Sequence, residues 1–306
     1  MRLVLRCIPR ILTQVTAVDR RVSTLLEDIS TRFVRGELSP PIALMRMLIA
    51  AEDVERVGAH VAPYAPLREL LASHRDGCAR ICAMLASGVD SDAEADSVDA
   101  GLAFARRLFD YSVEASEESS VALYSLGSPE LLAAATAEVV ALLDDWALLQ
   151  AHARCLEIGC GIGRFQAALG PRVQEARGLD LSARMIAAAR RRCATVPNVA
   201  FDVTDGRDLS MFAAGRFELV YAVDSFPYLV QAGMALVDTH FAEAHRVLVA
   251  GGCFVLLNFS YHDDLARDRR DIAQLADAHG FAVETDGELP FHLWDGAAWR
   301  LRKIGR

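Results

Sequence analysis

Short apolar runs alternate with helical patterns from residue 153 onward, and this alternation constrains the fold more than any other feature of the chain. Five runs have strand length: ARCLEIG, EARGLDLS, NVAFDVTD, FELVYAVDS and CFVLLNFS. Helical stretches such as ARMIAAARRRCA and HFAEAHRVLV separate them. Strands and helices in this order build βαβ units. The sequence therefore predicts an α/β, Rossmann-like doubly wound sheet, whose ligands bind beyond the carboxyl ends of the strands.

The last stretch of the chain has a different pattern. GFAVETDGELPFHLWDGAAWRLRK carries Asp295-Gly296 between two aromatic-rich runs. An Asp-Gly pair between two such runs is a hairpin signal. We therefore expect the parallel sheet to end in an antiparallel hairpin.

The first part of the chain contains helical patterns and almost no strand pattern. AVDRRVSTLLEDISTRFVRG has apolar residues at helical spacing, and SPPIALMRMLIAAEDVERV opens with Ser39 as an expected N-cap. Further helices are predicted over 66–85 and 98–111, separated by the acidic stretch GVDSDAEADSVD, which we interpret as a solvated loop. Ser128 is expected to cap the helix that begins at Pro129.

Composition and charge restrict the partners. The chain has 306 residues and a formal net charge of -9, which would repel a phosphate backbone, so we expect no nucleic-acid partner. No apolar run approaches the roughly 20 residues that a membrane span needs, and we expect a cytoplasmic protein without a membrane partner. Seven cysteines, an odd number, favour a reducing compartment.

One pair of cysteines has the spacing of a helix turn. Cys78 and Cys82 lie one turn apart in CARIC, and His74 lies one turn before them. A metal site would need further ligands, and free cysteine is most often a buried core residue. We therefore expect a buried helix face and no metal.

The run LEIGCGIGRF joins a predicted strand to a predicted helix through three glycines. Only glycine permits both a sharp turn and the close approach of a ligand to bare backbone. The spacing is Gly159-x-Gly161-x-Gly163, whereas the dinucleotide fingerprint is G-x-G-x-x-G. Glu157 precedes the first glycine, and an acid there would oppose a phosphate but suit a cationic ligand.

Two further acids follow predicted strands. Asp180 in GLDLS can accept both hydroxyls of a ribose, and Asp180 or Ser182 can also cap the next helix. Asp205 in DVTDGRDL can accept a hydrogen bond from an exocyclic amine, and Asp205-Gly206 can equally be a plain turn. Both pairs of interpretations stay open at this point.

The motifs LEIGCGIGRF, GLDLSARMI, TDGRDL, FELVYAVDSFPYL and EAHRVLVAGGCFVLLNFS resemble, in this order, those of class I S-adenosylmethionine-dependent methyltransferases. The resemblance covers about residues 120–306, and HRVLVAGG is close to the RVLKPGG of that family, with Val249-Ala250 in place of Lys-Pro. It implies a seven-stranded, mostly parallel sheet with a terminal antiparallel hairpin. We expect the methyltransferase domain to span 116–306, preceded by a helical lid or dimerisation region over 1–115.

The resemblance also implies S-adenosyl-L-methionine as cofactor and S-adenosyl-L-homocysteine as product, and it assigns cofactor contacts residue by residue. They are Glu157, Gly159, Gly161, Gly163 and Arg164 at the methionine part, Asp180 at the ribose, Leu181 and Met185 beside the adenine, Asp205 at the adenine amine, Gly206 as a backbone contact, and Ala222, Val223 and Asp224 near the sulfonium.

Methyl transfer from a sulfonium is an in-line displacement, in which the protein mainly positions the nucleophile and excludes water. A general base helps when the acceptor is a hydroxyl or a protonated amine. Three residues are candidates for a catalytic role: His262 and Tyr261 after the fifth strand, and Tyr124, which we expect to close over the cofactor. Phe226, Tyr228 and His292 are expected to line the substrate pocket.

These observations favour a methyltransferase that acts on a small-molecule acceptor and forms a homodimer through its N-terminal helices. Methylation of a peptide or protein side chain is the alternative within the same class. A nicotinamide-dependent oxidoreductase is disfavoured by the glycine spacing and by Glu157. A non-catalytic relative of the fold is disfavoured because Glu157, the three glycines and Asp180 are all present.

Overall fold

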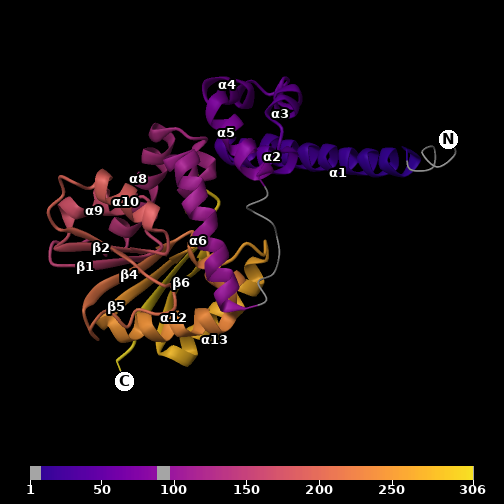
Figure 1. Ribbon diagram of the computed structural model, residues 1–306. Coiled ribbons are helices and arrows are strands. Elements are labelled where there is room, and N and C mark those ends of the chain that lie inside the picture. The colour runs from indigo at the N-terminus through magenta and orange to yellow at the C-terminus, as the bar shows by residue number, and fades with distance from the viewer. Residues whose placement is uncertain (1–7, 88–96, 306) are drawn as a thin grey trace.

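The structure is a computed structural model that describes residues 8–87 and 97–305, with side chains described from residue 19 onward. The acidic stretch that we interpreted as a loop spans residues 88–99, and residues 88–96 of it lie outside the described residues. Figure 1 shows an α/β domain with a group of helices at one end, from which the first helix extends.

A seven-stranded sheet with the order β3-β2-β1-β4-β5-β7-β6 forms the centre of the molecule (Figure 1). Neighbours from β3 to β5 are parallel, and β7 pairs antiparallel with both β5 and β6. The prediction of a mostly parallel sheet that ends in an antiparallel hairpin is confirmed. The strands are β1 Arg154–Ile158, β2 Glu175–Asp180, β3 Val199–Val203, β4 Phe217–Val223, β5 Leu248–Leu257, β6 Phe281–Glu288 and β7 Ala298–Lys303.

The strand order reverses at β1, which has β2 on one side and β4 on the other. Glu157 on β1 is in register with Gly178 on β2 and with Tyr221 on β4. The carboxyl ends of these three strands therefore meet at one edge of the sheet. In open α/β sheets this switch point is where ligands bind.

The predicted position of the hairpin turn, at Asp295-Gly296, is wrong. The strands β6 and β7 are joined by residues 289–297, so Asp295-Gly296 lies in a longer connection and is not a two-residue turn. Asp295 instead accepts a hydrogen bond from Arg46, with 2.6 Å between Nη2 and Oδ2. The rings of Phe291 and Trp294 stack at 5.1 Å, and the Trp294 ring also stacks on Tyr124. The aromatic run thus packs against the helical part of the chain and does not pair as a strand.

Helices build the chain as far as β1, as the sequence predicted, but two of the predicted helices are each divided. The helix expected over 66–85 breaks at His74, and Asp53 caps a separate helix within the stretch that Ser39 opens. Ser39 precedes that stretch without a side-chain cap hydrogen bond, whereas Ser128 Oγ accepts from the Leu131 N–H as expected. The α-helices are α1 Ile8–Val34, α2 Pro40–Ala51, α3 Val54–Val61, α4 Ala65–Ser73, α5 Arg75–Ala86, α6 Val98–Ala115, α7 Glu117–Val121 and α8 Pro129–Asp145, with the short 3-10 helix η2 Leu123–Ser125 before α8.

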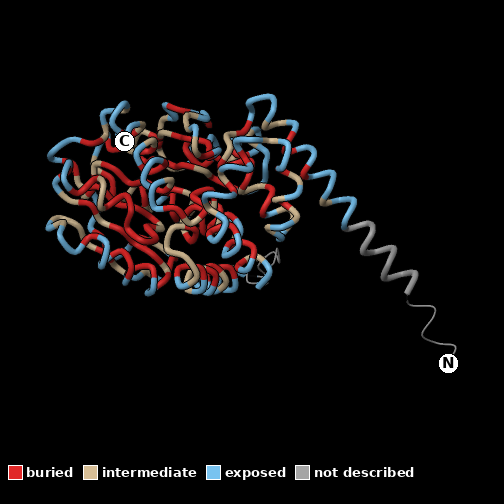
Figure 2. The backbone as a smooth tube through the Cα atoms, turned by 90° about the horizontal axis from the view of Figure 1, so that it is seen from above, coloured by how far each residue is buried: buried red, intermediate tan, exposed pale blue. Residues whose placement is uncertain are grey.

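Two hydrophobic cores lie on opposite faces of the sheet, because alternate side chains of a strand point to opposite faces. Cys155 and Tyr221 face the core shared with α8, α9 and the N-terminal helices, and Leu156 and Val220 face the core under α11, α12 and α13. Figure 2 shows that the buried segments, in red, gather inside the body of the molecule, while exposed segments are most frequent at its rim. The remaining α-helices are α9 Arg164–Leu169, α10 Ala183–Arg192, α11 Phe226–Ala232, α12 Met234–Val247 and α13 Leu265–His279.

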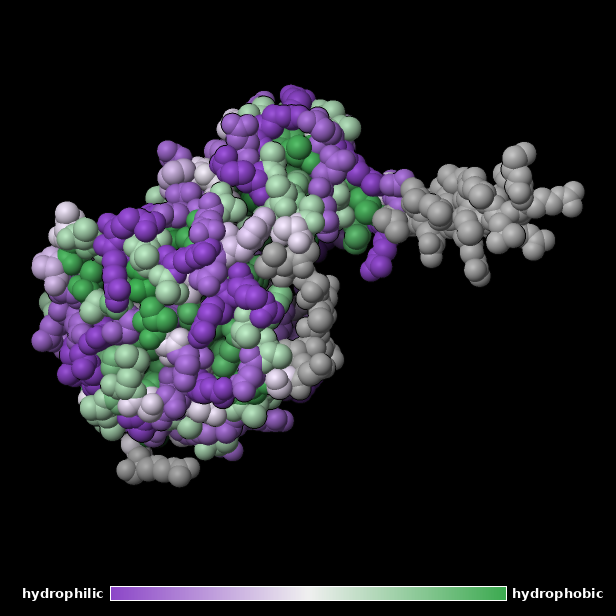
Figure 3. All heavy atoms as spheres, in the orientation of Figure 1, coloured by the Kyte–Doolittle hydropathy of each residue, from purple (hydrophilic) through white to green (hydrophobic). Residues whose placement is uncertain are grey.

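The cysteine pair Cys78 and Cys82 is buried in the core that the helices share with the sheet. No group of three or more potential metal ligands occurs among the described residues. On the face seen in Figure 3, hydrophobic residues form separate patches between polar ones. Within the described ranges, no helix is both long and apolar enough to cross a membrane.

Candidate functional site

The glycine loop turns the chain from β1 into α9 through three residues with left-handed backbone. Gly159, Gly161 and Gly163 have φ values of 75°, 51° and 72°. A Cβ on Gly159 would lie 2.4 Å from the Cβ of Ser225, and one on Gly161 would lie 2.5 Å from Cγ1 of Val121. Both the turn and the packing therefore require glycine.

Asp180 at the end of β2 braces this loop from the next strand. Its carboxylate accepts from the Gly161 N–H at 2.9 Å and from the Ser182 N–H at 2.8 Å. Ser182, and not Asp180, caps α10, because its Oγ accepts from the Met185 N–H at 3.0 Å. Burial raises the pKa of Asp180 to about 6, although the backbone hydrogen bonds oppose the shift.

Glu157 is buried beneath the loop, with 1% of its surface exposed. Gln166 Nε2 donates to Glu157 Oε2 at 2.7 Å and to the Tyr221 hydroxyl at 3.3 Å. Burial raises the pKa of Glu157 to about 8, and the Gln166 hydrogen bond and the Arg164 charge reduce this shift without cancelling it. At neutral pH the side chain therefore keeps its proton for most of the time, and a cation beside it would favour the ionised form.

Gln166 and Tyr221 are site residues that the sequence reasoning missed. Gln166 lies two residues after Arg164, on the first turn of α9, and Tyr221 faces Glu157 through the parallel register of β1 and β4. Gln166 Oε1 is buried without a hydrogen-bond partner in the described part of the chain. Only the pairing of β1 with β4 would have indicated Tyr221, and that pairing cannot be predicted without knowing the order of the strands in the sheet.

Arg164 and Tyr124 lie beside each other near the glycine loop. The Arg164 guanidinium is buried, 4.4 Å from the centre of the Phe165 ring, and its Nη1 is 3.4 Å from Thr136 Oγ1. Tyr124 in η2 is also buried, and burial raises its pKa although Arg164 beside it has the opposite effect. The segment between α6 and α8 contacts the glycine loop through Val121, whose Cγ1 lies over Gly161, and closure of Tyr124 over a cofactor stays a prediction.

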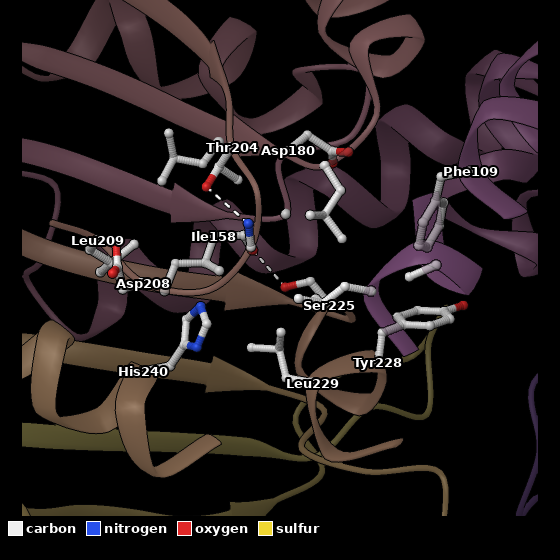
Figure 4. Close-up of a pocket in the computed structure, with 16 residues that line it drawn as sticks. Phe109, Ile158, Asp180, Thr204, Asp208, Leu209, Ser225, Tyr228, Leu229 and His240 are labelled. Carbon is white, nitrogen blue, oxygen red and sulfur yellow. Dashed lines mark hydrogen bonds between the residues drawn. The ribbon is translucent and has the colours of Figure 1, made fainter. Parts of the chain in front are cut away.

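A recess opens beside the loop, at the ends of β1, β2 and β4 (Figure 4). Its cavity volume is about 60 Å³, which is small beside the roughly 300–1,000 Å³ of a typical small-molecule site, so the walls must move apart to admit a nucleoside. One wall comes from α6, so the helical region takes part in the site. The apolar lining is Leu102, Ala105, Phe109, Ile158, Gly159, Leu179, Leu181, Gly206, Leu209 and Leu229, and the polar lining is Asp180, Thr204, Asp208, Ser225, Tyr228 and His240.

A second cluster of polar side chains lies at the carboxyl ends of β4 and β5. Asp224 Oδ1 accepts from Asn258 Nδ2 at 2.7 Å and from the Tyr261 hydroxyl at 3.1 Å. Asp224 and Asn258 both have left-handed backbone, with φ values of 55° and 67°. Burial raises the pKa of Asp224 to about 6. The Tyr261 ring packs edge-to-face on Tyr228, which lines the recess.

Several residues that the sequence singled out lie away from the recess. Phe226 is fully buried, in the core with Phe241, Phe254 and Phe259. The side chains of His262 and His292 are exposed, and their backbone N–H groups donate to Ser260 Oγ and to Glu138 Oε2 respectively. Asp205 is exposed and accepts from the Arg207 N–H, while Met185, Ala222 and Val223 are buried around the site without lining the recess.

The family model described as a methyltransferase domain matches residues 156–256. No curated protein sequence matches this chain significantly. Among solved structures, phosphoethanolamine N-methyltransferase 1 from Haemonchus contortus, in complex with phosphoethanolamine and S-adenosylhomocysteine, matches with 16% identity and a TM-score of 0.56, over 69% of this chain and 50% of its own.

Two further structures match with lower scores. Magnesium protoporphyrin IX methyltransferase from Synechocystis PCC 6803, with bound S-adenosylmethionine, has 14% identity and a TM-score of 0.49, over 66% of this chain and 97% of its own. The N-methyltransferase NodS from Bradyrhizobium japonicum WM9 has 21% identity and a TM-score of 0.45, over 58% and 99%. The Haemonchus contortus structure, with the highest TM-score of the three, supports the fold.

Proposed function

Because the chain belongs to the class I S-adenosylmethionine-dependent methyltransferase superfamily, we propose that it transfers a methyl group from S-adenosylmethionine to a small-molecule acceptor. One observation carries this proposal. Three carboxyl groups, those of Glu157, Asp180 and Asp224, stand at the carboxyl ends of β1, β2 and β4 around the glycine loop, and burial raises the pKa of each.

The chemistry of these residues fits a cationic ligand. A buried carboxylate with a raised pKa becomes fully charged when a positive group approaches it. S-adenosylmethionine carries an ammonium and a sulfonium, and when bound it supplies an electrophilic methyl group. A nicotinamide dinucleotide would instead place a pyrophosphate against Glu157, which is why the oxidoreductase alternative remains disfavoured.

Different residues in and around the glycine loop are assigned to different parts of the cofactor. We assign Glu157 to the ammonium and Arg164 to the carboxylate of the methionine part, since their opposite charges lie beneath the same loop. Asp180 holds the ribose hydroxyls with the same carboxylate that braces the Gly161 N–H. Leu181 lies against Gly206, where a Cβ would come within 2.5 Å of it, and together they provide a flat apolar surface for the base.

The N-terminal helical region acts as a lid in this proposal. Helix α6 supplies Leu102, Ala105 and Phe109 to the recess, and Val121 of α7 lies over Gly161. Enclosure by helices excludes water and orients the acceptor. An enclosed site admits a small molecule more readily than a protein side chain, so we favour a small-molecule acceptor over a peptide or protein.

Proton removal from the acceptor is assigned to the Asp224 carboxylate, which the Tyr261 hydroxyl positions through its hydrogen bond. The Tyr261 hydroxyl donates to Asp224, and a carboxyl group with a pKa of about 6 accepts a proton near neutral pH. Tyr124 is buried with a raised pKa, so it keeps its proton and serves as a hydrogen-bond donor. His262 is exposed on the same loop as Tyr261 and is the alternative base.

The outer helices suggest how two copies would associate. Helix α1 extends beyond the body of the molecule (Figure 1). The side chains of Leu25 and Val34 on this helix are exposed. Exposed apolar side chains on a projecting helix favour association with another apolar surface. We propose a cytoplasmic homodimer formed through the N-terminal helices.

Methyl transfer to fractionated acceptors tests the proposal. Radiolabelled S-adenosylmethionine is incubated with the protein and either the small-molecule filtrate or the macromolecular fraction of a cell extract. The proposal expects label in small molecules, which is lost in Asp180→Ala and kept in Asp277→Ala, a matched change of an exposed carboxylate on α13. Label that enters only the macromolecular fraction would contradict the small-molecule assignment.

A further inference from the structure

His240 lines the recess, although its position in the sequence gives no sign of a functional role. It lies on α12, is 2% exposed, and its ring points toward Ile158 and Asp208 in Figure 4. The ring also packs edge-to-face on Phe226, with 6.3 Å between ring centres. In a neutral histidine one ring nitrogen is a hydrogen-bond donor and the other is an acceptor, so the role of His240 depends on which nitrogen faces the recess.

The hydrogen bonding of His240 fixes its tautomer. Nδ1 is 2.9 Å from the Leu236 carbonyl oxygen, which can only accept, so Nδ1 carries the hydrogen. Burial lowers the pKa of His240, and the ring is therefore neutral at physiological pH. Nε2 is left as a lone-pair acceptor, and no hydrogen bond to it occurs among the described residues.

Two carboxyl groups line the recess together with His240. Asp208 lines the same end of the recess, and hydrogen bonds from Ser210 lower its pKa, so it is ionised. Asp180, at the position that we assign to the ribose, lines the recess away from His240 and Asp208 (Figure 4). A nucleoside anchored at Asp180 would thus direct its base toward two hydrogen-bond acceptors.

We propose that Nε2 of His240 accepts a hydrogen bond from the 6-amino group of the cofactor's adenine, and that it thereby selects a 6-amino purine over a 6-oxo purine. This inference rests on the proposed function. Asp205, which the sequence suggested for the same amine, is exposed and does not line the recess. A 6-oxo group would face acceptors with its own lone pairs, and that arrangement is unfavourable.

Calorimetric titration with two ligands tests the role of His240. The ligands are S-adenosylhomocysteine and S-inosylhomocysteine, in which a carbonyl replaces the 6-amino group. We expect the wild type to bind the adenosyl ligand at least tenfold more tightly. His240→Phe keeps an aromatic ring but lacks Nε2, and it should lose about tenfold in affinity for the adenosyl ligand and about twofold or less for the inosyl ligand. Asp205→Ala should keep the wild-type preference.

The outcomes separate this inference from the proposed function. If the wild type binds neither ligand, the proposed function itself fails. If His240→Phe keeps the wild-type preference, or weakens both ligands equally, His240 is a packing residue and the inference is overturned while the proposed function stands. His240→Gln, which offers an amide oxygen as acceptor, provides a second variant should His240→Phe unfold, and it should retain a preference for the adenosyl ligand.

Discussion

Replacement of Glu157 by glutamine should stabilise the ligand-free protein while weakening its hold on the cofactor. Burial raises the pKa of Glu157 from its ordinary value of 4.5 to about 8. At pH 7 the folded protein must therefore keep a proton on this group that the unfolded chain has released. One pKa unit corresponds to about 1.4 kcal/mol, so the 2.5 units between 4.5 and 7 destabilise the fold by roughly 3 kcal/mol.

Glutamine has the size of protonated glutamate and carries no charge to neutralise. Its amide oxygen can accept from Gln166 Nε2, which donates to Glu157 at 2.7 Å in the wild type. Because the folded pKa is raised, the penalty is absent below about pH 4.5 and grows until about pH 8. The variant should therefore exceed the wild type in unfolding free energy by roughly 3 kcal/mol at pH 7 and by less than about 1 kcal/mol at pH 5.

Urea unfolding of the ligand-free protein at pH 5 and pH 7 measures this difference. Glu218→Gln is the matched control, because hydrogen bonds from Arg154 outweigh burial and lower the pKa of Glu218. That variant should be less stable than the wild type at pH 7. The reasoning is refuted if Glu157→Gln is less stable than the wild type at pH 7, or if the difference does not depend on pH.

Three further predictions concern the ribose site, the loop and the base. Asp180→Asn should weaken S-adenosylhomocysteine binding at least tenfold in a calorimetric titration, and an unchanged affinity would contradict the ribose assignment. Gly161→Ala should destabilise the protein by about 1–3 kcal/mol, because its Cβ would lie 2.5 Å from Val121 Cγ1 and its φ is 51°. The double variant with Val121→Ala should recover part of that loss in thermal unfolding, and no recovery would place the strain elsewhere. Tyr261→Phe should lower kcat at least tenfold while His262→Ala leaves it unchanged, and the reverse result would move the base to His262.

Local chemistry explains which parts of the fold the sequence could predict. Glycines with left-handed backbone, the cap at Ser128 and the alternation of apolar runs depend on neighbours in the sequence, so the glycine loop and the parallel sheet were predictable. The break at His74 was not, because the apolar pattern continues through it. The role of Asp295 depends on Arg46, which is far away in the sequence.

The same distinction applies to the candidate site. Glu157 and Asp180 stand at strand ends that the sequence marks, whereas Tyr221 and His240 reach the site only through strand order and helix placement. Phe226 follows a strand end but turns into the core, where it packs on other aromatic rings. A strand end thus identifies the edge of the sheet where a residue lies, and the packing of the following helix decides which way its side chain points.

Calorimetric titration of the wild-type protein with S-adenosylmethionine tests whether this chain binds the methyl donor. We predict saturable binding at one site per chain, competition by S-adenosylhomocysteine, and no competition by NAD. Tight binding of NAD without any response to S-adenosylmethionine would contradict this prediction.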